Sequence, residues 1–198
     1  MNELSFPLEL RFKIVAIAPQ FSVTDRHGAP VLYIRQKAFK LKESIKVYAD
    51  ESRQHPLFDI AADRILDFNA SYRFRTAEGE DLGAVKRKGM RSLWRSKYLL
   101  EDEAGTHEAT IREENPWAKV GDSLIGEVPF LGMLSGYLFH PSYLVTSTDG
   151  TELVRARKEP AFWEGRFTLE KLGEMDDLQA YRVLLGLVML ILLERNRG

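Results

Sequence analysis

The sequence predicts a mainly β protein, a single closed antiparallel barrel of about twelve strands around a buried C-terminal apolar helix. Three observations support this prediction. One kind of hairpin turn recurs along the chain, runs of alternating apolar and polar residues flank each turn, and the stretch Val183–Leu193 has no charged or hydrogen-bonding side chain. A helix that is apolar on every face must be enclosed on every side, so we expect the strands to close around it.

The first strand is expected over Leu8–Ile17. Leu8, Leu10 and Phe12 alternate with charged residues, which is the period of two expected from a half-buried strand. Two apolar runs then flank Asp25–Gly28. Asp favours a turn closed on its own backbone and Gly tolerates positive φ, so this stretch predicts a hairpin.

The same turn recurs at a spacing of roughly 25 residues over the first four turns, and a fifth follows about 45 residues later; such spacing is typical of short strands in a sandwich or barrel. Each turn opens with an Asp, Thr or Ser, and three residues later comes a Gly in every turn but one, where Arg53 stands instead. The openers are Asp25, Asp50, Thr76, Asp102 and Ser147, and the glycines are Gly28, Gly79, Gly105 and Gly150.

Five hairpins supply ten strands, and Leu8–Ile17 and Gly165–Glu170 bring the total to about twelve. Because an eleven-stranded barrel already holds a central helix, this number leaves room for one. The helix is expected over about 177–196, with Asp176 or Asp177 as its cap. Gly186 predicts a close approach of a strand to the helix.

A C-terminal membrane anchor is the alternative for this helix and would make the chain a tail-anchored, membrane-associated protein. The apolar run is shorter than the 18 or so residues that suggest a bilayer span, and Arg182 lies within the helical segment. We therefore favour the buried core helix, and residues 1–198 as one domain.

Composition limits the classes of function. The formal net charge of -1 gives no global attraction to nucleic acid, so no nucleic-acid partner is expected. The absence of cysteine excludes disulfides and thiol catalysis. The first residues, MNELSFPLEL, lack the basic start and the apolar core of a signal peptide, so we expect a cytoplasmic protein.

The strongest candidate site is a basic stretch, Lys86–Lys97, that contains a tryptophan and no acidic residue. If Val85 faces the interior, then Lys86 and Lys88 face outward together. Such a patch suits an anionic phospholipid at a membrane surface. The alternative is a solvated strand face whose cations pair with acidic neighbours such as Glu101. The proposed ligand-binding residues are Lys86, Arg87, Lys88, Arg91, Trp94, Arg95 and Lys97. Arg155, Arg157 and Lys158 form a weaker second patch.

The segment 124–139 is an apolar insertion between the fourth and fifth hairpins, with a single charge. It either plugs one end of the barrel or forms an exposed apolar patch that meets a membrane or, through Phe130 and Leu131, a protein partner. No nucleotide-binding motif, histidine pair or catalytic carboxylate pair is recognisable, so we expect a non-enzymatic protein without metal or cofactor. An enzyme acting in a cleft at a barrel end is the least supported hypothesis.

Four features together resemble the LURP-one-related proteins of bacteria, which share the tubby-like fold with tubby C-terminal domains and phospholipid scramblases. They are the D-x-x-G turns, the basic-aromatic run Lys86–Trp94, the segment Glu114–Trp117 and the terminal Leu192–Arg195. The resemblance implies a twelve-stranded barrel around a helix. Tubby domains bind phosphoinositides through basic residues, whereas scramblases are associated with a calcium-binding acidic stretch. The nearest acidic residues here, Glu174, Asp176 and Asp177, lack the pattern of a calcium loop.

Overall fold

The computed structural model describes residues 3–13, 20–35, 44–64, 71–88, 97–114, 142–160 and 164–195. These ranges contain twelve strands followed by one helix. The strands are β1 (Leu8–Lys13), β2 (Gln20–Thr24), β3 (Pro30–Arg35), β4 (Ile45–Tyr48), β5 (Pro56–Arg64), β6 (Ser71–Thr76), β7 (Asp81–Lys88), β8 (Lys97–Glu101), β9 (His107–Glu113), β10 (Ser142–Ser147), β11 (Glu152–Glu159) and β12 (Glu164–Lys171); the helix is α3 (Asp177–Arg195).

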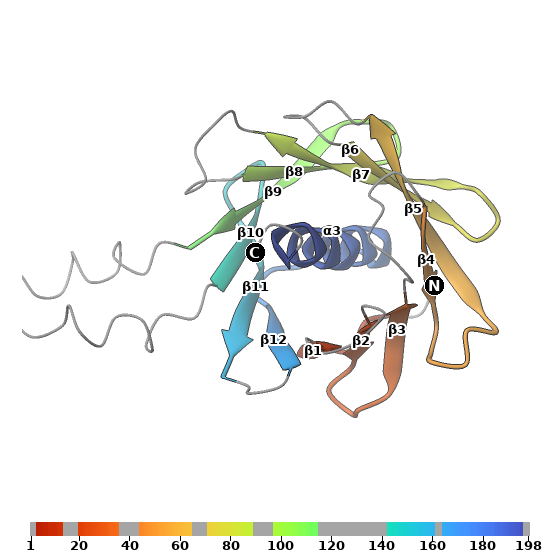
Figure 1. Cartoon of the computed structure of the whole chain (residues 1–198). Coiled ribbons are helices and arrows are strands. Elements are labelled where there is room, and N and C mark those ends of the chain that lie inside the picture. Colours follow the sequence, from red (N-terminus) through yellow and green to blue (C-terminus); the bar gives the residue numbers. More distant parts are fainter. Residues whose placement is uncertain are drawn as a thin grey trace, which may run out of the picture.

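The strands form a closed barrel in which each strand pairs with its neighbours in the sequence. The ring closes because β1 pairs with both β2 and β12, and both pairings are antiparallel. Figure 1 shows the closed ring of strands with α3 inside it. The predicted fold class, a closed antiparallel barrel of about twelve strands around a C-terminal helix, is confirmed.

The five predicted hairpin turns share one backbone geometry. In each, the residue three positions after the opener donates its N–H to the opener's carbonyl, over 3.0 to 3.2 Å. That residue has positive φ in all five turns, including Arg53 at φ 58°. The Asp25, Asp50 and Asp102 carboxylates also accept backbone N–H groups of their own turns. The repeat seen in the sequence is therefore a repeat of local hydrogen bonding.

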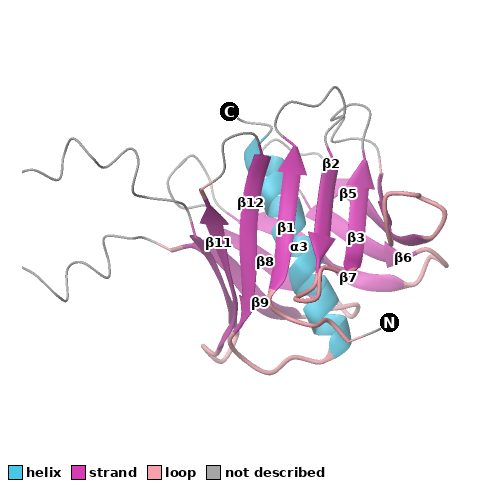
Figure 2. Cartoon of the chain, turned by 90° about the horizontal axis from the view of Figure 1, so that it is seen from below, coloured by secondary structure: helices cyan, strands magenta, loops and turns pink. Residues whose placement is uncertain are grey.

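Helix α3 runs lengthwise through the barrel and forms its core (Figure 2). The Asp176 side chain caps it by accepting the N–H of Gln179 at 2.7 Å. Its apolar residues between Val183 and Leu193 are at most 7% exposed. A Cβ on Gly186 would lie 2.6 Å from Leu100 Cδ2, so this glycine lets the helix approach the wall, as predicted.

Element boundaries differ little from those expected. Strand β1 is described as far as Lys13, and residues 14–17 of the expected first strand lie outside the described ranges. The last strand extends one residue beyond Gly165–Glu170 at each end, and α3 ends at Arg195. The apolar insertion 124–139 also lies outside the described ranges, so the two alternatives for it stay predictions.

Candidate functional site

Strand β7 carries the first part of the predicted basic patch. Val85 is buried, and Lys86 and Lys88 follow on the outer side of the wall. Their register partners on β8 are Leu99 and Lys97. Because side chains alternate along a strand, Lys86 and Lys88 both face outward, as the sequence predicts.

Lys86 is already neutralised. Its ammonium group lies 2.7 Å from the Glu101 carboxylate of β8, which is largely shielded from solvent. This is the pairing with an acidic neighbour that the alternative interpretation of the patch expects. An anion approaching Lys86 would therefore compete with a carboxylate already in place.

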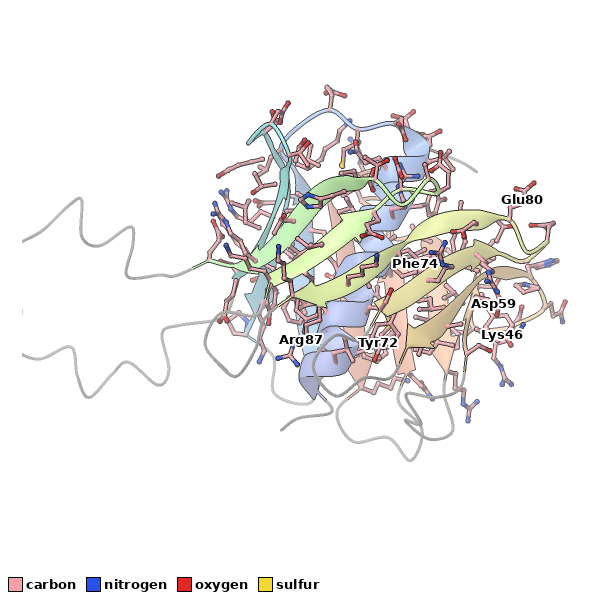
Figure 3. The ribbon with its side chains drawn as sticks, turned by 90° about the horizontal axis from the view of Figure 1, so that it is seen from above. Lys46, Asp59, Tyr72, Phe74, Glu80 and Arg87 are labelled. Atoms are coloured by element: carbon pink, nitrogen blue, oxygen red, sulfur yellow. The ribbon has the colours of Figure 1, made fainter. Side chains whose placement is uncertain are left out.

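Arg87 belongs to the other face of the wall. It pairs in register with Tyr98, whose ring is fully buried, so the two side chains lie on the inner side of the barrel wall. Figure 3 shows Arg87 far from Glu80, toward the opposite barrel end. Arg87 is therefore separated from Lys86 and Lys88 by the sheet itself.

The structure instead aligns three cations from three adjacent strands. Lys88 of β7 lies directly opposite Lys97 of β8, and Lys97 lies directly opposite Arg112 of β9. All three side chains are exposed. Neighbouring strands are about 4.8 Å apart, so this cation row, Lys88–Lys97–Arg112, spans roughly 10 Å of the outer surface.

Within the described ranges, no salt bridge or side-chain hydrogen bond joins a member of the cation row to another residue. Four other outer cations are paired: Lys46 with Asp59, Lys86 with Glu101, Arg166 with Glu164 and Lys171 with Glu174. Like charges directly opposite on neighbouring strands destabilise a sheet by up to about 1 kcal/mol per pair. A bound anion would remove this repulsion.

Arg112 is the member of the row that sequence reasoning missed. The signal was present, because Arg112 alternates with buried Ile111 and the turn at Asp102–Gly105 fixes the pairing of β8 with β9. Counting outward from that turn and allowing for the bulge at Leu100/Glu101 gives the pair Lys97–Arg112. The pair Lys88–Lys97 has no such signal, because residues 89–96 intervene.

Several predicted site residues lie outside the described ranges. They are Arg91, Trp94 and Arg95 of the basic patch, and Phe130 and Leu131 of the insertion. The weaker second patch is partly neutralised, because Arg155 forms salt bridges with Glu114 at 3.2 Å and with Glu152 at 3.1 Å. Arg157 on the same strand is exposed.

A hollow of about 180 Å³ lies on the opposite wall, over β1 to β3. Its lining mixes Arg11 and Lys13 with Glu51 and Glu164, so it has no net preference for an anion. Burial, and next the Glu51 charge, raise the pKa of Tyr33, which lines the hollow, so that phenol stays protonated at neutral pH. At neutral pH the Tyr33 phenol is therefore a hydrogen-bond donor and not a base.

The described residues contain neither a metal-binding cluster nor a membrane-spanning helix. These residues hold no group of three or more His, Asp or Glu side chains arranged to bind a metal ion. The acidic residues before α3 have other roles there, since Glu174 pairs with Lys171 and Asp176 caps the helix. No helix in the described part of the chain is long and apolar enough to cross a membrane.

Comparison with known protein families gives a match. The family model described as LURP-one-related matches residues 30–170, which include β3 to β11 and most of β12. All three members of the cation row lie within the matched stretch. No match is found among curated proteins or among solved structures.

Proposed function

The chain belongs to the LURP-one-related family, and we propose that it is a non-enzymatic binding module that engages anionic phospholipid through its cation row. The cation row carries this proposal: it places Lys88, Lys97 and Arg112 side by side and exposed, without a carboxylate partner in the described ranges. The proposal retains two residues of the predicted patch, sets aside the paired Lys86 and adds Arg112.

Lipid phosphate suits this geometry better than an isolated carboxylate does. A phosphate group presents several acceptor oxygens and makes charge-assisted hydrogen bonds with ammonium and guanidinium groups. A bilayer surface also presents many such groups at once, so that each cation in the row can meet one. Anionic lipids give the cytoplasmic leaflet a negative potential, so we propose a peripheral position on that leaflet.

Vesicle co-sedimentation tests the proposal. The chain is mixed with phosphatidylcholine vesicles, with and without phosphatidylserine, and compared with the variant Lys88→Gln/Lys97→Gln. A basic residue near an anionic surface contributes about 1 kcal/mol, so losing two should weaken binding on the order of 30-fold. Binding should also weaken as salt rises, because exposed charges are screened within about 10 Å at 0.1 M ionic strength.

A matched control distinguishes the effect of the cation row from that of lowering the total positive charge of the protein. The variant Lys46→Gln/Lys171→Gln removes the same charge from two lysines that are ion-paired elsewhere on the outer surface. It should bind anionic vesicles as the unmodified chain does. Equal binding by both variants, or equal binding to both kinds of vesicle, would sink the proposal.

A further inference from the structure

Among the residues that the structure describes, the two ends of the barrel differ in charge. The five tight turns and the link from β12 to α3 share one end, the turn end, because consecutive strands are antiparallel neighbours around the ring. In these connections carboxylates far outnumber the two arginines, Arg26 and Arg53. The carboxylates are Asp25, Asp50, Glu51, Glu78, Glu80, Asp102, Glu103, Asp149, Glu174 and Asp176.

The opposite end, the cationic end, carries the cation row. Lys13 and Arg35 lie there too, at the last residues of β1 and β3, and both are exposed. Carboxylates also occur at this end: Glu113, Glu114, Glu159 and Glu164. Glu114 and Glu164 are ion-paired with Arg155 and Arg166. Even with Glu113 and Glu159 counted against them, the exposed cations Lys13, Arg35, Lys88, Lys97 and Arg112 make the described part of this end positive.

The distance between the ends exceeds the range of screened electrostatics. Helix α3 has 19 residues and so spans about 28 Å along the barrel. The Debye length is about 8 Å at physiological ionic strength. A carboxylate-rich end facing an anionic surface is therefore repelled, whereas the same end turned away is too distant for the surface to affect it.

The helix dipole opposes this arrangement but does not decide it. The positive N-terminal end of α3 lies at the turn end, and the negative end lies at the cationic end. Each end is equivalent to about half a charge. Several full side-chain charges at each end outweigh that contribution.

We infer, on the premise of the proposed function, that the barrel docks end-on against an anionic lipid surface. Its cationic end faces the lipid and its turn end points away. The partner is a bilayer that presents anionic headgroups, because an extended surface can meet the cation row and the exposed cations of the opposite wall at the same time. A barrel lying on its β7–β9 wall would use the row alone.

Site-specific labelling tests this orientation. The chain has no cysteine, so a single introduced one carries a fluorophore at a known position. Arg35→Cys places the label at the cationic end, on the wall opposite the row. Glu78→Cys places it in the β6–β7 turn at the turn end. Vesicles of phosphatidylcholine and phosphatidylserine carry a nitroxide quencher on the lipid headgroup.

The expected result is quenching several-fold stronger at position 35 than at position 78, scaled to the fraction of protein bound. Lys13→Cys, at the same end, provides a second label position if Arg35→Cys folds poorly. Three results, each with the protein sedimenting with vesicles, would overturn the orientation and leave the proposed function standing. They are equal quenching at both positions, stronger quenching at position 78, and no quenching at either position. Failure to sediment would overturn both.

Discussion

Arg53 is a side-chain-bearing residue in a backbone conformation that suits glycine. Its φ of 58° is positive, as are the φ angles of 78° to 93° that Gly28, Gly79, Gly105 and Gly150 adopt in the corresponding turns. For a residue with a Cβ this geometry costs roughly 1 to 2 kcal/mol. The turn tolerates the cost because its hydrogen bonds, Arg53 N–H to Asp50 carbonyl and Ser52 N–H to Asp50 carboxylate, are intact.

Replacing Arg53 with Gly should therefore stabilise the protein. The relief of backbone strain is partly offset by the greater freedom of glycine in the unfolded chain, which leaves a net gain of roughly 0.5 to 1 kcal/mol. For a chain of this size that corresponds to a rise in Tm of about 1 to 4 °C in thermal unfolding.

Gly105→Ala is the matched control. It places a side chain at φ 80° in an equivalent turn, where a Cβ would meet nothing within 4 Å. Its cost is then purely one of backbone conformation, so Tm should fall. A lower Tm for Arg53→Gly would contradict the strain argument.

Among the elements, α3 carries a charge into the barrel. Arg182 is 5% exposed and donates two hydrogen bonds to Glu108, at 2.7 and 2.9 Å, and one to Glu103 at 3.1 Å. Burial opposes the charged form, yet the two carboxylates outweigh it and the pKa of Arg182 is raised. This ion pair ties the first turns of α3 to β9 and to the β8–β9 turn.

The ion pair predicts an asymmetry between single and double variants. Glu108→Leu leaves a buried guanidinium with only the half-exposed Glu103, and removing one partner of a buried pair costs about 3 to 5 kcal/mol. The double variant Arg182→Met/Glu108→Leu replaces both charges with apolar groups, so its free energy of unfolding should be much closer to that of the unmodified chain.

Chemical denaturation of the two single variants and the double variant measures this as a double-mutant cycle. A double variant whose loss equals the sum of the single losses would show that the two residues are not coupled. Equal denaturation midpoints for Glu108→Leu and the unmodified chain would show that Glu108 is not needed to stabilise the buried charge of Arg182.

Sequence reasoning succeeded at this scale where the signal is local. The turn openers, the alternation on each strand and the apolar run of α3 are properties of a few consecutive residues, and they led to the barrel and its core helix. Sequence reasoning treated Arg182 as an interruption of an apolar helix, because its partners Glu103 and Glu108 are more than 70 residues away. Sequence reasoning placed Lys88 and Lys97 in one patch but did not predict that they lie directly opposite each other, because their register depends on the long connection 89–96.

For the molecule as a whole, closure of the barrel depends on α3. Its apolar residues occupy the interior, and from Val183 to Leu193 they are nearly fully buried. Burying one such side chain contributes about 1.5 to 3 kcal/mol. A ring of twelve strands without the helix would enclose an empty apolar space that neither water nor side chains fill.

Deleting Val183–Gly198 should therefore abolish cooperative unfolding and expose apolar surface to a hydrophobic dye, whereas a chain lacking only Asn196–Gly198 should melt as the full chain does. Leu187→Asp keeps the length of the chain but buries an unpaired charge, so it should also destabilise the protein and increase dye binding. A truncated chain that still melts in one sharp transition would show that the strands close without α3. If the deletion unfolds the protein, the apolar side chains of α3 are committed to the core, and attraction to a membrane must come from the outer surface, where the cation row lies.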